Sequence, residues 1–197
     1  MPADFIPELS FYASLHWTLP NGQPELHGLS ATYLDQAPSA LDNGWIYCSS
    51  GDSYSGKKRV ALGLDEVAGR LVGLHFWFAC HRIASSSDLP SYRYNLRVFQ
   101  EQAHNNPFQF YTLDKSRNGF LALYQLNPFN APLWEINGLG ASRPEAGAQV
   151  DNLTLASAEG GRVRRLVEDG FPYLSDRAGH DARFTARIAS ADFKGPW

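Results

Sequence analysis

The amino-acid sequence predicts an all-β protein, specifically an antiparallel β-sandwich with one short helix. Apolar and polar residues alternate with a period of two in short runs, and Gly, Pro, Asn and Asp separate these runs. Many short strands beside little helical sequence are typical of sandwiches and barrels. Ten runs show the pattern: residues 11–19, 25–34, 45–49, 59–64, 70–83, 92–99, 109–113, 119–126, 150–156 and 183–189.

The first run, residues 11–19, fits two periodicities. Phe11, Ala13, Leu15 and Trp17 alternate as in a strand, although the apolar residues of this segment could also form a helical stripe. We favour a strand here.

The last run, residues 183–189, shows the alternation most clearly. Phe184, Ala186 and Ile188 would face one side of a sheet. Arg183 and Arg187 would face the other side, as expected for a strand with one face in the core and one face in water.

The predicted helix covers residues 161–169. Val163, Leu166 and Val167 would lie on one stripe of it, and Gly170 would end it. There is no fixed-period repeat, low-complexity tract or break in composition, so we expect a single domain over residues 1–197.

Charge and composition exclude several classes of protein. Seventeen Lys and Arg against twenty Asp and Glu give a formal net charge of −3, and the short basic clusters at 57–59 and 162–165 do not form a stripe. We therefore expect no nucleic-acid partner. Residues 1–9 show neither the basic n-region nor the apolar h-region of a signal peptide, so we expect none in the sequence as given, and no apolar run approaches the ~20 residues that span a bilayer. We expect a soluble protein and assign it no location; as a toxin it would be released and act on target membranes.

Neither a metal site nor a cofactor is expected. Cys48 and Cys80 are too few for a zinc site and lie in apolar runs, which favours buried reduced thiols over a disulfide. His75 and His81, six residues apart on one strand, would lie about 20 Å apart, too far for one metal ion. No catalytic residues are assigned, because the Ser-containing turn at 51–56 lacks the Gly-x-Ser-x-Gly spacing of a hydrolase elbow.

Aromatic residues gather in turn-rich segments near Pro128, Pro132 and Pro172. Rings in such segments are difficult to bury completely, and exposed rings bind sugars, sterols or quaternary ammonium groups. They can equally cap the core. The residues concerned are Tyr124, Phe129, Trp134, Phe171 and Tyr173.

Residues 57–130 also resemble a known family. The segment Lys-Lys-Arg-Val-Ala-Leu-Gly-Leu-Asp-Glu-Val-Ala-Gly is similar to an early strand and turn of the sea-anemone actinoporins. The Gly-Leu-His-Phe-Trp-Phe strand at 73–78, the Ser-rich loop at 85–90 and the Asn-Gly-Phe-Leu-Ala-Leu-Tyr segment at 118–124 follow in the same order. Actinoporins are β-sandwich cytolysins grouped with related lectins.

The resemblance implies an aromatic-rich pocket for a phosphocholine head group, and pore formation by oligomerisation on a membrane. The residues implied for the pocket are Ser87, Gln125, Pro128, Phe129, Trp134 and Tyr173. Two features depart from the family: 56 residues, mostly strand-like, precede Lys57 where the family has an amphipathic helix, and its Tyr-rich segment is reduced here.

The leading hypothesis is a β-sandwich that binds a membrane-lipid head group or a glycan and acts as a pore-forming toxin or a lectin. One alternative is a small barrel or jelly-roll enzyme acting on a small molecule. Its pocket would be lined by His75, Trp77, His81, Arg93 and Arg97. The other alternative is a protein-interaction module.

Overall fold

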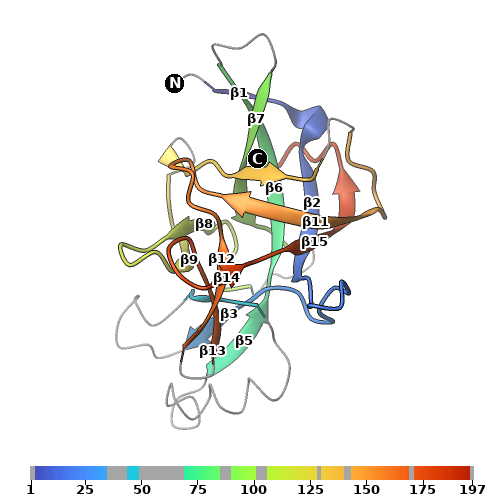
Figure 1. Cartoon of the computed structure of the whole chain (residues 1–197). Helices are drawn as coiled ribbons and strands as arrows, with labels where there is room; N and C mark the ends of the chain where they lie inside the picture. The colour runs from blue at the N-terminus through green and yellow to red at the C-terminus, as the bar shows by residue number, and fades with distance from the viewer. Residues whose placement is uncertain are drawn as a thin grey trace.

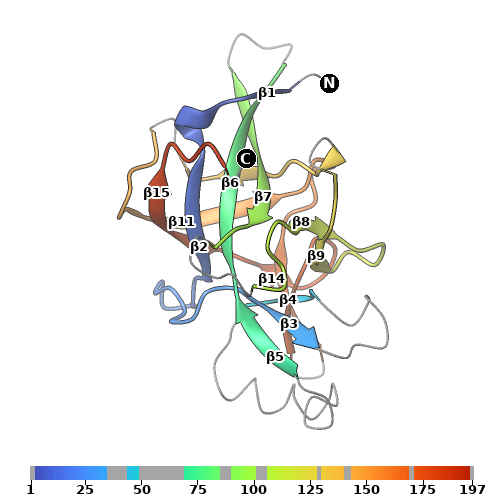
Figure 2. The same cartoon turned by 180° about the vertical axis from the view of Figure 1, so that it is seen from behind.

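Two antiparallel β-sheets make up the fold (Figures 1 and 2). The computed structural model describes residues 3–34, 44–48, 69–84, 90–100, 106–127, 130–139, 143–168 and 171–195. These residues form fifteen strands, nine in one sheet and six in the other. The predicted antiparallel β-sandwich is confirmed.

The nine-stranded sheet carries most of the core. Its strand order is β10 (Glu135–Asn137), β11 (Gln149–Ala156), β15 (Phe184–Ala191), β2 (Phe11–Trp17), β6 (His75–Ile83), β7 (Ser91–Val98), β8 (Thr112–Lys115) and β9 (Leu121–Tyr124), and β1 (Ala3–Phe5) also pairs with β6. The ambiguous first run is therefore a strand.

The six-stranded sheet has the order β14 (His180–Asp181), β12 (Arg164–Glu168), β13 (Phe171–Ser175), β4 (Ile46–Tyr47), β3 (Ser30–Leu34) and β5 (Gly69–Gly73). The predicted run 70–83 is thus divided between the two sheets. Only Leu74 separates β5 from β6; it is 1% exposed, and its N–H donates to the carbonyl of Leu29 at 2.9 Å. The chain therefore passes from one sheet to the other at this residue.

Period-two alternation explains the core. On β2, Phe11, Ala13 and Leu15 are fully buried, and Phe11 stacks on its cross-strand partner Phe78 with ring centroids 4.5 Å apart. Each such buried ring contributes roughly 1.5–3 kcal/mol. One hydrophobic cluster contains residues of both sheets.

The opposite face of β6 is also covered. Trp77 is 1% exposed, its indole N–H donates to the carbonyl of Phe193 at 3.0 Å, and its ring meets Phe5 edge-on. The N-terminal strand and the C-terminal segment therefore close over a face that the sequence presents as polar and aromatic.

The predicted helix at 161–169 is wrong. Residues 164–168 form strand β12, which pairs with β13 through five residues and with β14 on its other side. A helix of nine residues is marginal on its own, and Val is a weak helix former, whereas two neighbouring strands satisfy the backbone of β12. Val167 is 49% exposed, so the apolar stripe is not buried as a unit.

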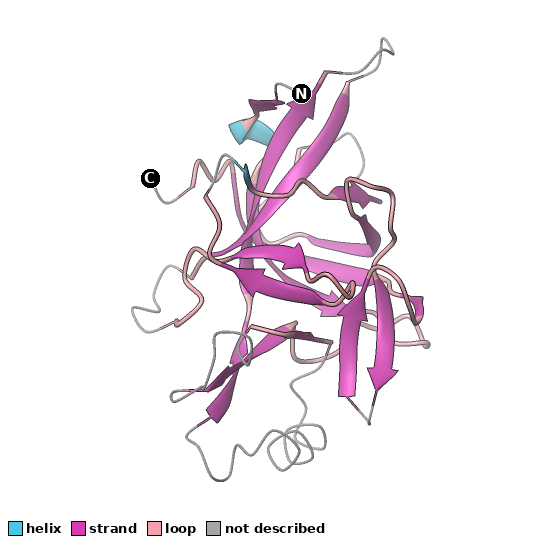
Figure 3. Cartoon of the chain, turned by 90° about the vertical axis from the view of Figure 1, so that its left-hand side faces the viewer, coloured by secondary structure: helices cyan, strands magenta, loops and turns pink. Residues whose placement is uncertain are grey.

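The short helix of the described residues lies elsewhere, as the 3-10 turn η1 (Pro7–Leu9). Figure 3 shows this turn near the N-terminus, beside the long strands. Within the described residues, no helix combines the length and the apolar character required to cross a bilayer.

Candidate functional site

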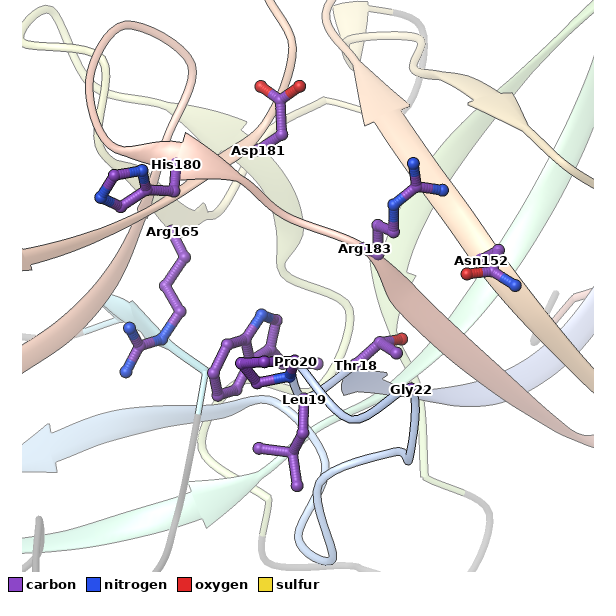
Figure 4. Close-up of a pocket in the computed structure, with 10 residues that line it drawn as sticks. Thr18, Leu19, Pro20, Gly22, Asn152, Arg165, His180, Asp181 and Arg183 are labelled. Atoms are coloured by element: carbon purple, nitrogen blue, oxygen red, sulfur yellow. The ribbon is translucent and has the colours of Figure 1, made fainter.

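An open groove lies where the end of β2 meets β12 and β14 of the other sheet (Figure 4). We call it the Trp17 groove; its volume is about 550 Å³. Cavities of this size hold small-molecule ligands. Its lining residues are Trp17, Thr18, Leu19, Pro20, Gly22, Asn152, Arg165, His180, Asp181 and Arg183.

A cation–π contact joins the two sheets at this groove. Trp17 is the last residue of β2, and the guanidinium carbon of Arg165 on β12 lies 4.3 Å from the centre of the Trp17 ring. Both side chains are half-buried. Such contacts contribute about 0.5–2 kcal/mol, depending on desolvation. The pair holds the indole in place at the junction.

A turn positions the apolar wall. The N–H of Leu19 donates to the carbonyl of Gln23, and the N–H of Gly22 donates to that of Leu19, each at 2.8 Å. Gly22 has a φ of +82°, a conformation that glycine adopts without strain. Leu19 and Pro20 of this turn line the groove beside Trp17.

His16 fastens the base of the same turn. Its Nδ1 lies 2.9 Å from the carbonyl of Glu25, and its Nε2 lies 2.9 Å from the hydroxyl of Ser14. Because a carbonyl only accepts, the proton belongs on Nδ1, and Nε2 accepts from Ser14. Burial lowers the pKa of His16, which favours this neutral form.

The polar flanks come from β11, β12, β14 and the residue that precedes β15. Arg165 and His180 are directly opposite each other on β12 and β14, so their side chains share one face of the sheet. Arg183 follows Ala182, whose N–H donates to the carbonyl of Val163 at 3.3 Å. Figure 4 shows Arg183 and Asn152 on one flank and Arg165 and His180 on the other.

Asn152 lies at an irregularity of β11. The register between β11 and β15 shifts between Val150 and Leu153, and Asn152 has a φ of +60°. A bulge of this kind re-aims a side chain, and non-glycine residues with positive φ gather at functional sites. The bulge therefore brings the Asn152 carboxamide to the groove.

No family model, curated protein or solved structure matches the chain. The resemblance to actinoporins therefore stays a prediction.

Of the residues that this resemblance implies, Ser87, Pro128 and Phe129 lie outside the described residues. Gln125 is exposed after β9. Trp134 is 1% exposed, and its indole N–H donates to the carbonyl of Leu113 at 3.1 Å, so it belongs to the core. Neither Gln125 nor Trp134 lines the Trp17 groove.

Tyr173 is half-buried on β13, in a cluster of aromatic rings. Its ring centre lies 5.0 Å from that of Tyr47 and 5.5 Å from that of Phe120, and Phe120 meets Trp45 edge-on at 5.9 Å. Trp45, Phe120 and Tyr173 are each partly exposed. We call these three rings the Tyr173 cluster.

The residues of the enzyme hypothesis lie on neighbouring strands. Trp77 pairs with Arg97 and His81 pairs with Arg93 across β6 and β7. Trp77 and Arg97 are nevertheless buried, at 1% and 6% exposure. Burial lowers the pKa of Arg97, His75 and His81. This face is packed over much of its length, which leaves the Trp17 groove as the better candidate.

Both cysteines are buried free thiols, as expected for reduced residues. Among the described residues, no three His, Cys, Asp or Glu side chains are grouped closely enough to hold a metal ion.

Proposed function

We propose that the protein binds a glycan or a lipid head group in the Trp17 groove. The observation that carries this proposal is the indole of Trp17, held by Arg165 beside Leu19 and Pro20. Small ligands are recognised by such a combination of an apolar wall and a few polar groups. Sugars suit it, because their rings carry an apolar face and a polar rim.

The position of the groove supports the proposal. It is built from β2, β11 and the residue before β15 on one side and from β12 and β14 of the other sheet. Backbone pairing fixes Trp17 opposite Phe184, and Arg165 opposite both Leu174 and His180. The lining is therefore set by strand ladders on rigid elements, as binding sites require.

A glycan array and a liposome sedimentation assay test the proposal, using the full chain and Trp17→Ala. We expect the variant to bind at least ~10-fold more weakly, since Trp is enriched among the residues that contribute most to binding. Phe110→Ala is the matched control: Phe110 is 48% exposed and does not line the groove. Melting curves verify that each variant folds. Equal binding by both variants, or no binding by the wild-type chain, would refute the proposal.

A second candidate site is the Tyr173 cluster. Phe120 meets both Trp45 and Tyr173 edge-on, at interplanar angles of 85° and 79°. The faces of partly exposed aromatic rings attract quaternary ammonium groups, such as the one in a choline head group. Titration with phosphocholine, followed by Trp fluorescence, tests this site; an unchanged response in Tyr173→Ala would exclude it.

Membrane damage by several assembled copies is the extension of this proposal that the actinoporin resemblance implies. Release of a dye trapped in vesicles, with and without sphingomyelin and sterol, tests it. Binding without release would favour a lectin-like recogniser over a pore-forming cytolysin.

A further inference from the structure

Three polar side chains that line the Trp17 groove have no hydrogen-bond or ion-pair partner among the residues that the structure describes. Asn152, His180 and Arg183 line it, and their side chains make no hydrogen bond or ion pair with any described residue. All three are exposed. Their hydrogen-bonding capacity is therefore directed to solvent or to a ligand.

The neighbouring charges behave differently. Arg162 and Arg164 both approach Asp181, at 3.6 and 3.5 Å. On the other side, the carboxylate of Asp151 accepts from the hydroxyl of Thr185 at 2.8 Å. Arg183 thus brings to this groove a guanidinium that forms no ion pair with a described carboxylate.

The surroundings of the groove are basic, although the chain is acidic. Of the residues that line it, Arg165 and Arg183 carry positive charge and Asp181 carries negative charge, whereas the whole chain has a net charge of −3. A local excess of positive charge attracts anions. Guanidinium groups bind carboxylate and phosphate oxygens in pairs.

We propose that the ligand of the Trp17 groove is a polyhydroxylated ring bearing an oxyanion, held by Arg183. The inference rests on the function proposed above. The oxyanion, a carboxylate, sulfate or phosphate, lies against Arg183. The carboxamide of Asn152 donates to and accepts from the ring hydroxyls beside it, and the apolar face of the ring packs on Pro20, Leu19 and Trp17. Acidic sugars and inositol-phosphate head groups share this chemistry.

The experiment compares Arg183→Gln with Arg187→Gln. Arg187 is an exposed arginine on β15 that does not line the groove, so its variant changes net charge equally without touching the site. The probes are an array of uronic, sulfated and neutral sugars, and vesicles with and without phosphatidylinositol phosphates. We expect acidic probes to bind, affinity to fall with salt, and Arg183→Gln to lose at least ~10-fold while Arg187→Gln loses less than ~2-fold.

A second variant separates the contact from the fold. Asn152→Gly keeps the positive φ and removes the carboxamide, so we expect a several-fold loss of affinity with an unchanged melting temperature. Sugar binding would assign the oxyanion to a glycan, and vesicle binding would assign it to a head group; either supports the inference.

Two outcomes overturn it. Binding of neutral sugars alone, or equal losses of affinity in the two Arg variants, would refute the inference that the ligand carries an oxyanion. The proposal that the Trp17 groove binds a ligand would be unaffected. A wild-type chain that binds none of the probes would refute the proposed function, and this inference with it.

Discussion

An ion pair between Lys115 and Asp176 connects the two sheets, and we expect it to stabilise the fold. Lys115 ends β8 of the nine-stranded sheet, and Asp176 follows β13 of the other. The Lys115 ammonium donates to Asp176 at 2.9 Å and also to Glu159. The N–H of Asp176 donates to the carbonyl of Gly119 at 2.9 Å. Asp176 therefore connects the two sheets twice, through an ion pair of its side chain and through a hydrogen bond of its backbone.

Replacing Asp176 by Ala should destabilise the protein by about 2–3 kcal/mol. Exposed ion pairs contribute about 0.2–1 kcal/mol, whereas breaking a buried pair costs about 3–5 kcal/mol. This pair lies between these limits, because the side chain of Asp176 is 5% exposed and that of Lys115 is 25% exposed. For a chain of this length, the melting temperature should fall by roughly 5–10 °C.

Chemical denaturation of the two single variants and their combination measures the coupling between Lys115 and Asp176. Lys115→Met serves as the second variant. Asp4→Ala is the control, since Asp4 pairs with Arg82 at the same 2.9 Å, but the two side chains are 67% and 54% exposed. The control should barely change the unfolding free energy. If Asp176→Ala costs no more than the control, or the double variant shows no coupling, burial of this pair does not stabilise the protein.

Three further predictions concern strain, pH and thiol reactivity. Gly119→Ala should lower the unfolding free energy, measured by urea denaturation, by about 1–3 kcal/mol, which is more than Gly22→Ala should lower it. Both glycines have a positive φ, but a Cβ at Gly119 would lie 2.8 Å from Asp176, whereas a Cβ at Gly22 would meet nothing within 4 Å. Equal losses would show that φ alone matters. Burial lowers the pKa of His75 and His81, so the unfolded protein binds protons at a higher pH than the folded protein does. The melting temperature should therefore fall as the pH decreases below about 6.5, and it should fall less in His75→Gln. A melting temperature that does not change with pH would contradict this. Burial raises the pKa of Cys80 to about 11, so a thiol reagent at pH 8 should leave it unmodified until denaturant is added. Rapid labelling of folded Cys80 would contradict it.

Much of the fold could be predicted from alternation alone. Phe11, Phe78 and Phe184 are fully buried where the period-two pattern places core residues. The same pattern failed at Arg164–Glu168, because three apolar residues in a short segment fit a helical stripe as well as a strand. The pairing of β12 with β13 and β14, the next two strands along the chain, decides between them.

The groove could not be predicted, because its residues are distant in sequence. Trp17, Asn152 and Arg183 come together through the pairing of β2, β11 and β15, and Arg165 joins them from β12 of the other sheet. One local signal existed: Asn152 interrupts a strand-like run, and Asn tolerates the left-handed conformation of a bulge. The strand pairing, rather than the residue types, determines which of the other side chains line the groove.

The passage of the chain through Leu74 has a consequence for how a ligand would bind. A single residue separates β5 from β6, and it is buried and hydrogen-bonded to Leu29. The two sheets therefore share a continuous backbone at a buried, hydrogen-bonded residue. A ligand entering between them would meet walls already in place and would lose little affinity to ordering the protein. Association should accordingly proceed in one step, at a rate set by encounter rather than by rearrangement of the protein.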